Sequence, residues 1–284
     1  MTFLVVLVST AVELAMGSIA TVRDTDWVGA WRDWLTGLLG QQSWWNGLGG
    51  LLVTVGIPML LIGLIGNWLA EWIWLAGFLF GVVVVLYCLG PGDLNRDIDR
   101  YFAATGDAER AAAVDALAAA FDSPHEDDPS FATRVMLVEA NDRIFAALFW
   151  FVVLGPMGIV LFRQASVMRH EAAESSESMS EWAEQLYQIL IWVPARLFAL
   201  GFGIAGSFTH AFEAWRAAED FSLGSAQQVL GAVGLAAVQA SQAPEANDAE
   251  ALLQRARAVR GLINRTLVVW LTLLALLALA GITP

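Results

Sequence analysis

Six long apolar stretches alternate with polar segments along the chain. They cover about residues 2–20, 47–68, 72–90, 144–162, 186–208 and 266–282. A helix rises about 1.5 Å per residue, so about 20 apolar residues cross the roughly 30 Å hydrocarbon core of a bilayer. The pattern therefore predicts an all-α polytopic membrane protein with about four to six membrane segments, connected by amphipathic helical loops. We treat residues 1–284 as a single domain.

The uncharged stretch at residues 144–162 is bracketed by Arg143 and Arg163. On a straight helix these arginines would lie about 30 Å apart, which matches the thickness of the bilayer core. Gly155 and Pro156 fall in the second half of this stretch. Because proline removes a helical hydrogen bond, we expect a kink there.

Two of the apolar stretches contain a charged residue. Glu13 lies in the first stretch, and Arg196 lies in the fifth, two residues after Pro194. A charge inside a bilayer is costly unless it faces protein, water or a partner. We therefore expect Arg196 to face the protein interior, a cavity or a carboxylate, unless its helix is re-entrant. Glu13 is either a ligand-side acid or the structural partner of an arginine.

A tight helical hairpin is predicted where residues 47–68 and 72–90 are separated by a short polar break. Gly77 and Gly81 in its second helix would let a neighbouring helix approach closely. Asp93 is then expected to cap an amphipathic helix. The polar face of that helix carries alternating charges, which we interpret as a solvated face or as a docking surface for a soluble partner or nucleotide phosphate: Asp93, Arg96, Asp97 and Arg100.

Composition supports the membrane assignment and excludes several activities. The chain is 57% hydrophobic with a mean hydropathy of +0.60, and soluble domains are about 45–50% apolar. The net charge is −13, so we expect no nucleic-acid partner, because no basic patch could neutralise phosphates. All basic residues are arginines. The absence of lysine excludes a Walker A loop and Schiff-base chemistry with pyridoxal phosphate.

Metal and redox sites are also not expected. Cys88 is the only cysteine, which excludes a disulfide within the chain and a CxxC site. His125, His170 and His210 are scattered, and no HExxH motif occurs. We therefore expect neither a metal nor a bound cofactor.

Polar residues gather just before the 144–162 stretch. Glu139 and Arg143 are four residues apart, in the favourable acid-before-base order. They form either a surface ion pair, part of a polar pocket for an anionic or amide-bearing ligand, or a catalytic acid–base pair. The candidate ligand-binding residues are Glu13, Glu139, Asn141, Asp142, Arg143, Pro194 and Arg196.

Several segments resemble the AmpE branch of the AmpE/CobD/CbiB superfamily. They are NDRIFAALFWFVVLGPMGIVLFRQA, IWVPARLFALGFGIAG, GDLNRDIDRYFAATGDAERA and AFEAWRAAEDFSLGSAQQVL, followed by a C-terminal apolar helix. The resemblance implies a multi-pass protein of the bacterial inner membrane. It further implies a regulatory signalling modulator associated with the AmpD amidase, peptidoglycan recycling and β-lactamase induction.

The CobD/CbiB relatives are adenosylcobinamide-phosphate synthases, and the resemblance makes an amide-forming synthase the first rival function. This chain departs from their motifs, since it reads VMLVEANDRIFAALF where they carry two glutamates, an asparagine and Asp-Gly. It also reads SVMRHEAAE where they carry Asp-Ser-Met-Val-Gly-Tyr-Lys. A small-molecule transporter is the second rival, because kinked spans around Arg196 suit a substrate path.

The expected partners follow from these interpretations. They are the lipid bilayer, a small-molecule or cell-wall-derived ligand, and a protein partner in β-lactamase regulation. The pattern is also compatible with a homo-oligomer.

Overall fold

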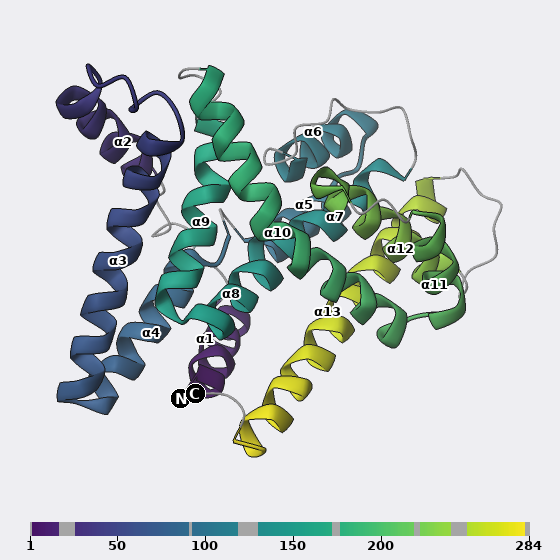
Figure 1. Cartoon of the computed structure of the whole chain (residues 1–284). Helices are drawn as coiled ribbons and strands as arrows, with labels where there is room; N and C mark the ends of the chain where they lie inside the picture. The colour runs from purple at the N-terminus through teal and green to yellow at the C-terminus, as the bar shows by residue number, and fades with distance from the viewer. Residues whose placement is uncertain are drawn as a thin grey trace. The chain divides into compact units, whose positions relative to one another are not determined.

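The chain is mostly helical in the part described by the computed structural model, which covers residues 2–16, 26–90, 93–118, 130–171, 177–218, 222–239 and 249–281. No strand occurs in these ranges. The last residues of the predicted stretches at 2–20 and 266–282 lie outside them. The elements are α1 (Thr2–Met16), α2 (Asp26–Leu39), α3 (Leu48–Trp72), α4 (Trp74–Cys88), α5 (Leu94–Ala103), α6 (Asp107–Leu117), α7 (Phe131–Ala140), η3 (Asn141–Phe145), α8 (Ala146–Leu154), α9 (Pro156–Glu171), α10 (Glu177–Ala205), α11 (Phe208–Ala217), η5 (Leu223–Ser225), α12 (Ala226–Gln239) and α13 (Ala249–Leu279) (Figure 1).

Three of the described helices are long and apolar enough to cross a membrane: Leu48–Trp72, Ser178–Ala205 and Glu250–Leu279. Three further apolar helices are shorter, at Thr2–Glu13, Trp74–Cys88 and Leu223–Val238. The prediction of an all-α membrane protein is confirmed.

Residue contacts divide the chain into two compact units. Unit 1 comprises Met1–Gly92, Ala146–Leu190 and Leu277–Pro284, and unit 2 comprises Asp93–Phe145 and Ile191–Leu276. Each unit therefore combines segments that are distant in sequence. Helices α10 and α13 contribute residues to both units.

The predicted hairpin of α3 and α4 lies in unit 1. Only Ile73 separates the two helices. A methyl group on Gly77 would lie 2.8 Å from the Cα atom of Ala70, and one on Gly81 would touch Val5 of α1 at 3.4 Å. The two glycines thus allow α4 to approach α3 and α1 closely, as their spacing predicts.

The prediction of a single helix over residues 144–162 is wrong. The helix ends at Leu154, and Gly155 adopts a φ of 66°, the left-handed conformation that favours glycine. A methyl group on Gly158 would lie 2.2 Å from the carbonyl oxygen of Trp150. Residues eight positions apart would be about 12 Å apart on a continuous helix. The chain therefore folds back, and α8 packs against α9 instead of continuing into it.

Pro194 lies inside α10, which stays helical through it. Because proline has no N–H group, the carbonyl of Leu190 lacks its usual helical donor. The indole Nε1 of Trp150 donates to this carbonyl oxygen at 2.8 Å. A side chain of α8 thus satisfies the carbonyl that Pro194 leaves without a donor.

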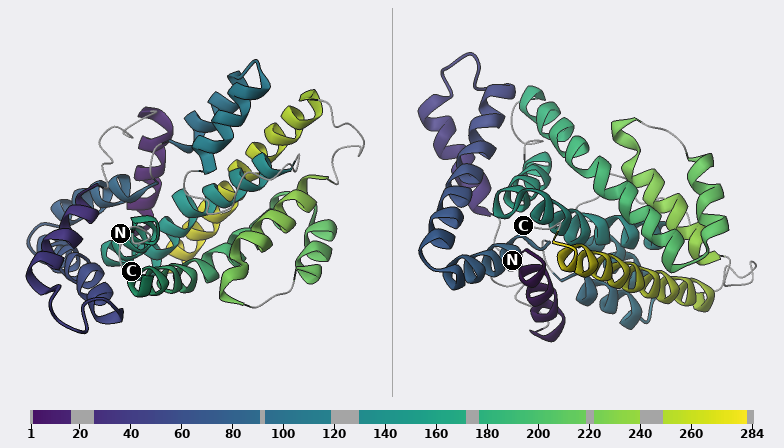
Figure 2. Two further views of the ribbon diagram at one scale, coloured as in Figure 1. Left: turned by 90° about the horizontal axis from the view of Figure 1, so that it is seen from above. Right: turned by 60° about the horizontal axis from the view of Figure 1, so that its bottom comes forward.

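Unit 2 contains the helices that hold the candidate site. Helices α11 and α12 lie side by side (Figures 1 and 2), and α12 also packs against α7. A methyl group on Gly234 of α12 would lie 2.6 Å from the side chain of Leu137 in α7. This close contact anchors α7, which leads directly into η3.

Candidate polar site at the Asn141 turn

A π-helical turn, η3, forms at Asn141–Phe145 between α7 and α8. The backbone N–H of Asn141 donates to the carbonyls of Leu137 and Val138, so Asn141 still completes the hydrogen bonding of α7. A π-turn holds one more residue than an α-turn and therefore rotates the following side chains around the axis. Such turns occur frequently at functional sites. Here the turn lies where the sequence concentrates its polar residues.

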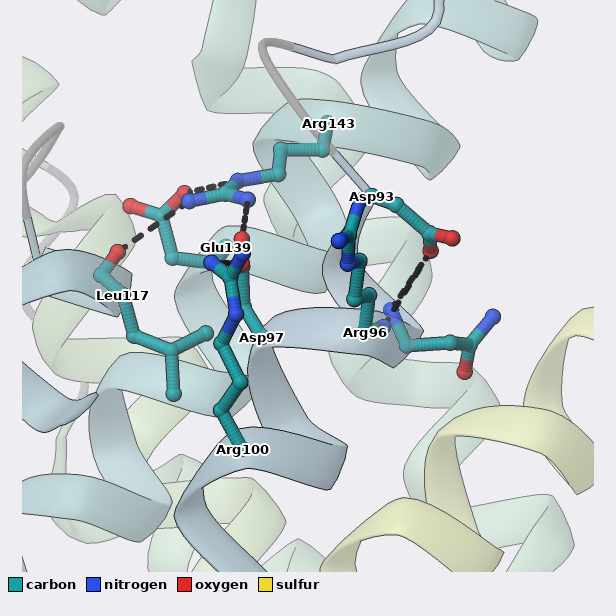
Figure 3. A network of polar contacts seen from close by, with 8 residues as sticks. Asp93, Arg96, Asp97, Arg100, Leu117, Glu139 and Arg143 are labelled. Carbon is teal, nitrogen blue, oxygen red and sulfur yellow. Dashed lines mark hydrogen bonds and ion pairs between the residues drawn. The ribbon is translucent and has the colours of Figure 1, made fainter. Parts of the chain in front are cut away.

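Arg143 is the centre of a buried ion-pair network (Figure 3). Its Nε atom lies 2.7 Å from Oε2 of Glu139, and its Nη1 atom lies 2.8 Å from Oδ2 of Asp97. Its Nη2 atom donates to the carbonyl of Leu117 at 3.2 Å. Arg100 then pairs with the other oxygen of Asp97 at 3.1 Å. The carboxylate of Asp97 therefore bridges two guanidinium groups.

Burial increases along this network from Arg100 to Glu139. The exposed fraction of the side chain is 57% for Arg100, 14% for Asp97, 5% for Arg143 and 1% for Glu139. Burial lowers the pKa of the Arg143 guanidinium, but the carboxylates of Glu139 and Asp97 outweigh this and hold that pKa above its usual value. The Glu139–Arg143 pair is thus buried, which contradicts the alternative of a surface ion pair.

The charged residues on the face of α5 make different contacts. Asp93 caps the helix as predicted, because its Oδ1 atom accepts hydrogen bonds from the backbone N–H groups of Asn95 and Arg96 at 3.0 and 3.3 Å. Asp97 points to Arg143, whereas the side chains of Arg96 and Arg100 are exposed. Asp97 therefore connects the proposed docking face to Arg143 of the proposed ligand site.

Asn141 is completely buried, with 0% of its surface exposed. Neither its Nδ2 nor its Oδ1 atom has a hydrogen-bond partner among the described residues. A buried polar group without a partner costs about 1–3 kcal/mol. Asp142 is also buried. The amide of Asn141 is thus able to donate to and accept from a bound molecule.

Arg196 faces the protein interior, as its position in an apolar stretch predicted. Its guanidinium lies over the ring of Trp192 at 3.8 Å from the centroid. Its Nη2 atom donates to the hydroxyl of Ser225 at 3.0 Å, and that hydroxyl donates to the carbonyl of Ser222 at 2.8 Å. The described contacts thus place Arg196 against the start of α12.

Two candidates remain, Pro194 and Glu13. Pro194 could contribute to a ligand site by leaving the Leu190 carbonyl without its helical donor. The indole of Trp150 already donates to this carbonyl. Glu13 is half-buried in α1 and belongs to unit 1. A site shared by Glu13 and the residues of unit 2 stays a prediction.

Some contacts of the site were not predicted from sequence. Asp97 was assigned only to the α5 face, and Ser225 and the Leu117 carbonyl were not considered. Leu117 is the last residue of α6, and the last carbonyls of a helix have no helical donor. This rule could have indicated that a carbonyl at the end of α6 needs a donor, but not that Arg143 supplies it.

The carboxylate of Glu139 is engaged in the ion-pair network. The Oε2 atom of Glu139 is held by Arg143, so this oxygen acts as an ion-pair acceptor. Within the described ranges, no group of three or more histidine, cysteine or acidic side chains could hold a metal ion. The unpaired polar atoms of the turn instead belong to the neutral amide of Asn141.

Comparisons with known proteins point to one family. The family model described as "Regulatory signalling modulator protein AmpE" matches residues 37–283. A Cobalamin biosynthesis protein CobD from Stutzerimonas stutzeri is 33% identical over 88 residues, which is 30% of this chain and 29% of the relative. A protein of the same name from Chromobacterium violaceum is 38% identical over 84 residues, or 28% and 26% of the two chains. The matched segment thus spans less than a third of each curated relative. No solved structure matches the chain.

Proposed function

Because the chain belongs to the AmpE family, we propose that it acts as a multi-pass regulatory protein of the bacterial inner membrane, linked to peptidoglycan recycling and β-lactamase induction. The family description supports the regulatory role, and the apolar helices support the membrane location. In this proposal, the protein binds a small cell-wall-derived ligand in the polar site at η3. The exposed side chains of Arg96 and Arg100 then remain available to a protein partner.

The observation that carries the ligand site is the buried, unpaired amide of Asn141. It lies two residues before Arg143, whose guanidinium is held by carboxylates on α5 and α7. A ligand that bonds to Asn141 would stabilise η3, and η3 is connected through Arg143 to the exposed face of α5. This arrangement offers a physical route from ligand binding to a surface that a partner could recognise.

The test is the induction of β-lactamase by muropeptides in the host bacterium. Deletion of this protein should change the induction profile, and expression of the wild-type chain should restore it. Asn141→Leu should fail to restore it, because the loss of the amide bonds weakens ligand binding about tenfold. Gln164→Leu is the matched control, because it removes a buried amide with no partner among the described residues from a position outside η3. An unchanged profile after deletion would overturn the proposal.

A membrane-embedded, amide-forming synthase is the second candidate, and the two CobD relatives favour it. In this case the purified protein should form an amide from an amine phosphate and a carboxylated acceptor. The absence of product with several acceptors would exclude this candidate. The regulator, in contrast, requires no turnover.

A further inference from the structure

Two polar atoms on α13 are buried without a hydrogen-bond partner among the described residues. They are Oγ1 of Thr266 and Nε1 of Trp270. Thr266 is 0% exposed. The two residues are four positions apart, so their side chains lie on the same face of the helix, one turn from each other. Both belong to unit 2.

Both side chains face the backbone of α10 at Gly201. A methyl group on Gly201 would lie 2.6 Å from Cγ2 of Thr266 and 2.7 Å from Nε1 of Trp270. Only glycine leaves room for this approach. The indole N–H group and the threonine hydroxyl are thus brought together at the crossing of α10 and α13.

The π-turn adjoins the same crossing. The ring of Phe145 lies 5.4 Å from that of Trp270 and 4.7 Å from that of Phe198 in α10, centroid to centroid. Asn141 is one turn before Phe145, and Thr266 is one turn before Trp270. The aromatic contact therefore connects the turn that carries Asn141 to the helix that carries the other two unpaired groups.

The unpaired groups of Asn141, Thr266 and Trp270 are all neutral. Their donors and acceptors indicate which kind of ligand group they can bind. The indole only donates, the hydroxyl donates and accepts, and the amide of Asn141 does both. The charge of Arg143 is already matched by Glu139 and Asp97. A carboxylate placed among neutral groups would be buried without a counter-charge, which is costly. An amide carries both an acceptor and a donor without a charge.

We infer that Thr266 and Trp270, together with Asn141, bind an uncharged amide group of the ligand. The inference rests on the proposed function, and it decides between the anionic and the amide-bearing ligands left open by the sequence. In this arrangement the carbonyl of the ligand accepts from the Trp270 indole and the Thr266 hydroxyl. The amide N–H of the ligand donates to Oδ1 of Asn141.

The inference can be tested with two sugars that differ in their amide groups. N,N′-diacetylchitobiose carries acetamido groups, whereas cellobiose carries hydroxyls at the same positions. The full chain, labelled with ¹⁵N-tryptophan and held in nanodiscs, gives an indole signal for Trp270 that Trp270→Phe assigns. The acetamido sugar should shift this signal and cellobiose should not. A signal that neither sugar shifts, or that both shift equally, would overturn the inference.

Thr266→Val provides a second measurement. It should weaken the binding of the acetamido sugar about tenfold, since one buried hydrogen bond is lost. It should not lower the Tm of the free protein, because the hydroxyl has no partner to lose. Thr272→Val is the matched control on the same helix, since the exposed Thr272 hydroxyl already donates to the Val268 carbonyl at 2.8 Å. Equal effects of the two variants on binding would contradict the inference.

The two proposals fail in different ways. If deletion changes β-lactamase induction but the Trp270 signal does not respond, only the inferred amide recognition is wrong. If the signal responds but deletion leaves induction unchanged, the amide site stands and its regulatory role is wrong.

Discussion

Arg143 and Arg163 bracket the same apolar stretch. They belong to different units, and each makes the same kind of contact within its own unit. Each is about 5% exposed, and each donates to the carbonyl of the last residue of a helix. Arg143 donates to Leu117 at the end of α6, and Arg163 donates through Nε to Cys88 at the end of α4 at 2.8 Å. A cation is favourable at the C-terminus of a helix, where the dipole is negative.

The other described contacts of the two arginines differ in kind. Arg143 also binds Glu139 and Asp97, and through Asp97 it is connected to an exposed arginine. The described hydrogen bond of Arg163 is to a backbone carbonyl, and its guanidinium lies 5.9 Å from the ring centre of Phe162. In both units, a buried arginine secures the end of a helix. A buried arginine with carboxylates can additionally connect a ligand site to a surface.

Arg143→Met should have the largest effect on stability. It removes the buried cation that the carboxylates of Glu139 and Asp97 share, and breaking a buried ion pair in this way costs about 3–5 kcal/mol. The free energy of unfolding should be measured in mixed micelles by denaturant titration. Arg100→Met is the control: its exposed pair with Asp97 should contribute at most about 1 kcal/mol. Similar losses in both variants would show that the network is not the stabilising feature.

Arg163→Met should cost less, about 2 kcal/mol, because it removes a charge-assisted hydrogen bond from the Cys88 carbonyl. The free energy of unfolding of Arg163→Met, measured in the same mixed micelles, can be compared directly with that of Arg143→Met. A loss as large as that of Arg143→Met would contradict the distinction between the two arginines.

The sequence was sufficient for features that depend on neighbouring residues. It predicted the helical hairpin of α3 and α4, the cap at Asp93, and a kink at residues 155–156. It did not predict that the chain folds back there, because this depends on tertiary packing: a methyl group on Gly63 of α3 would lie 2.0 Å from Sδ of Met157 in α9. A kink was therefore expected where a complete break occurs.

The same distinction applies to the candidate site. The pair of Glu139 and Arg143 follows from their spacing of four residues. Asp97 is 46 residues from Arg143, and only the packing of α5 against α7 brings its carboxylate there. No pattern within one sequence indicates such a contact.

Trp150→Phe tests a third helix carbonyl that is satisfied by a side chain. It should cost about 1–3 kcal/mol, because the Leu190 carbonyl loses its donor. In a Pro194→Ala background the new N–H group can supply this bond, so the cost should fall by about 1 kcal/mol. The loss of ring volume is common to both backgrounds, and a double-mutant cycle of unfolding free energies removes it. A coupling energy of zero would show that the indole bond does not replace the one lost to proline.

The smallest effects on stability are expected from substitutions of the buried amide side chains near each arginine. Asn141 lies near Arg143, and Gln164 follows Arg163; both amides are buried, with no partner on either polar atom among the described residues. Asn141→Leu and Gln164→Leu each remove a buried amide that makes no bond, which stabilises, but they also place a bulkier side chain in a packed site, which costs about 1–3 kcal/mol. The two effects offset each other, so each variant should change the unfolding free energy by no more than about 1 kcal/mol, in either direction. Only Asn141→Leu should also impair β-lactamase induction, because only its amide belongs to the proposed ligand site. If Gln164→Leu impairs induction equally, the ligand is not specific to the network of Arg143, and the two arginines are equivalent in function.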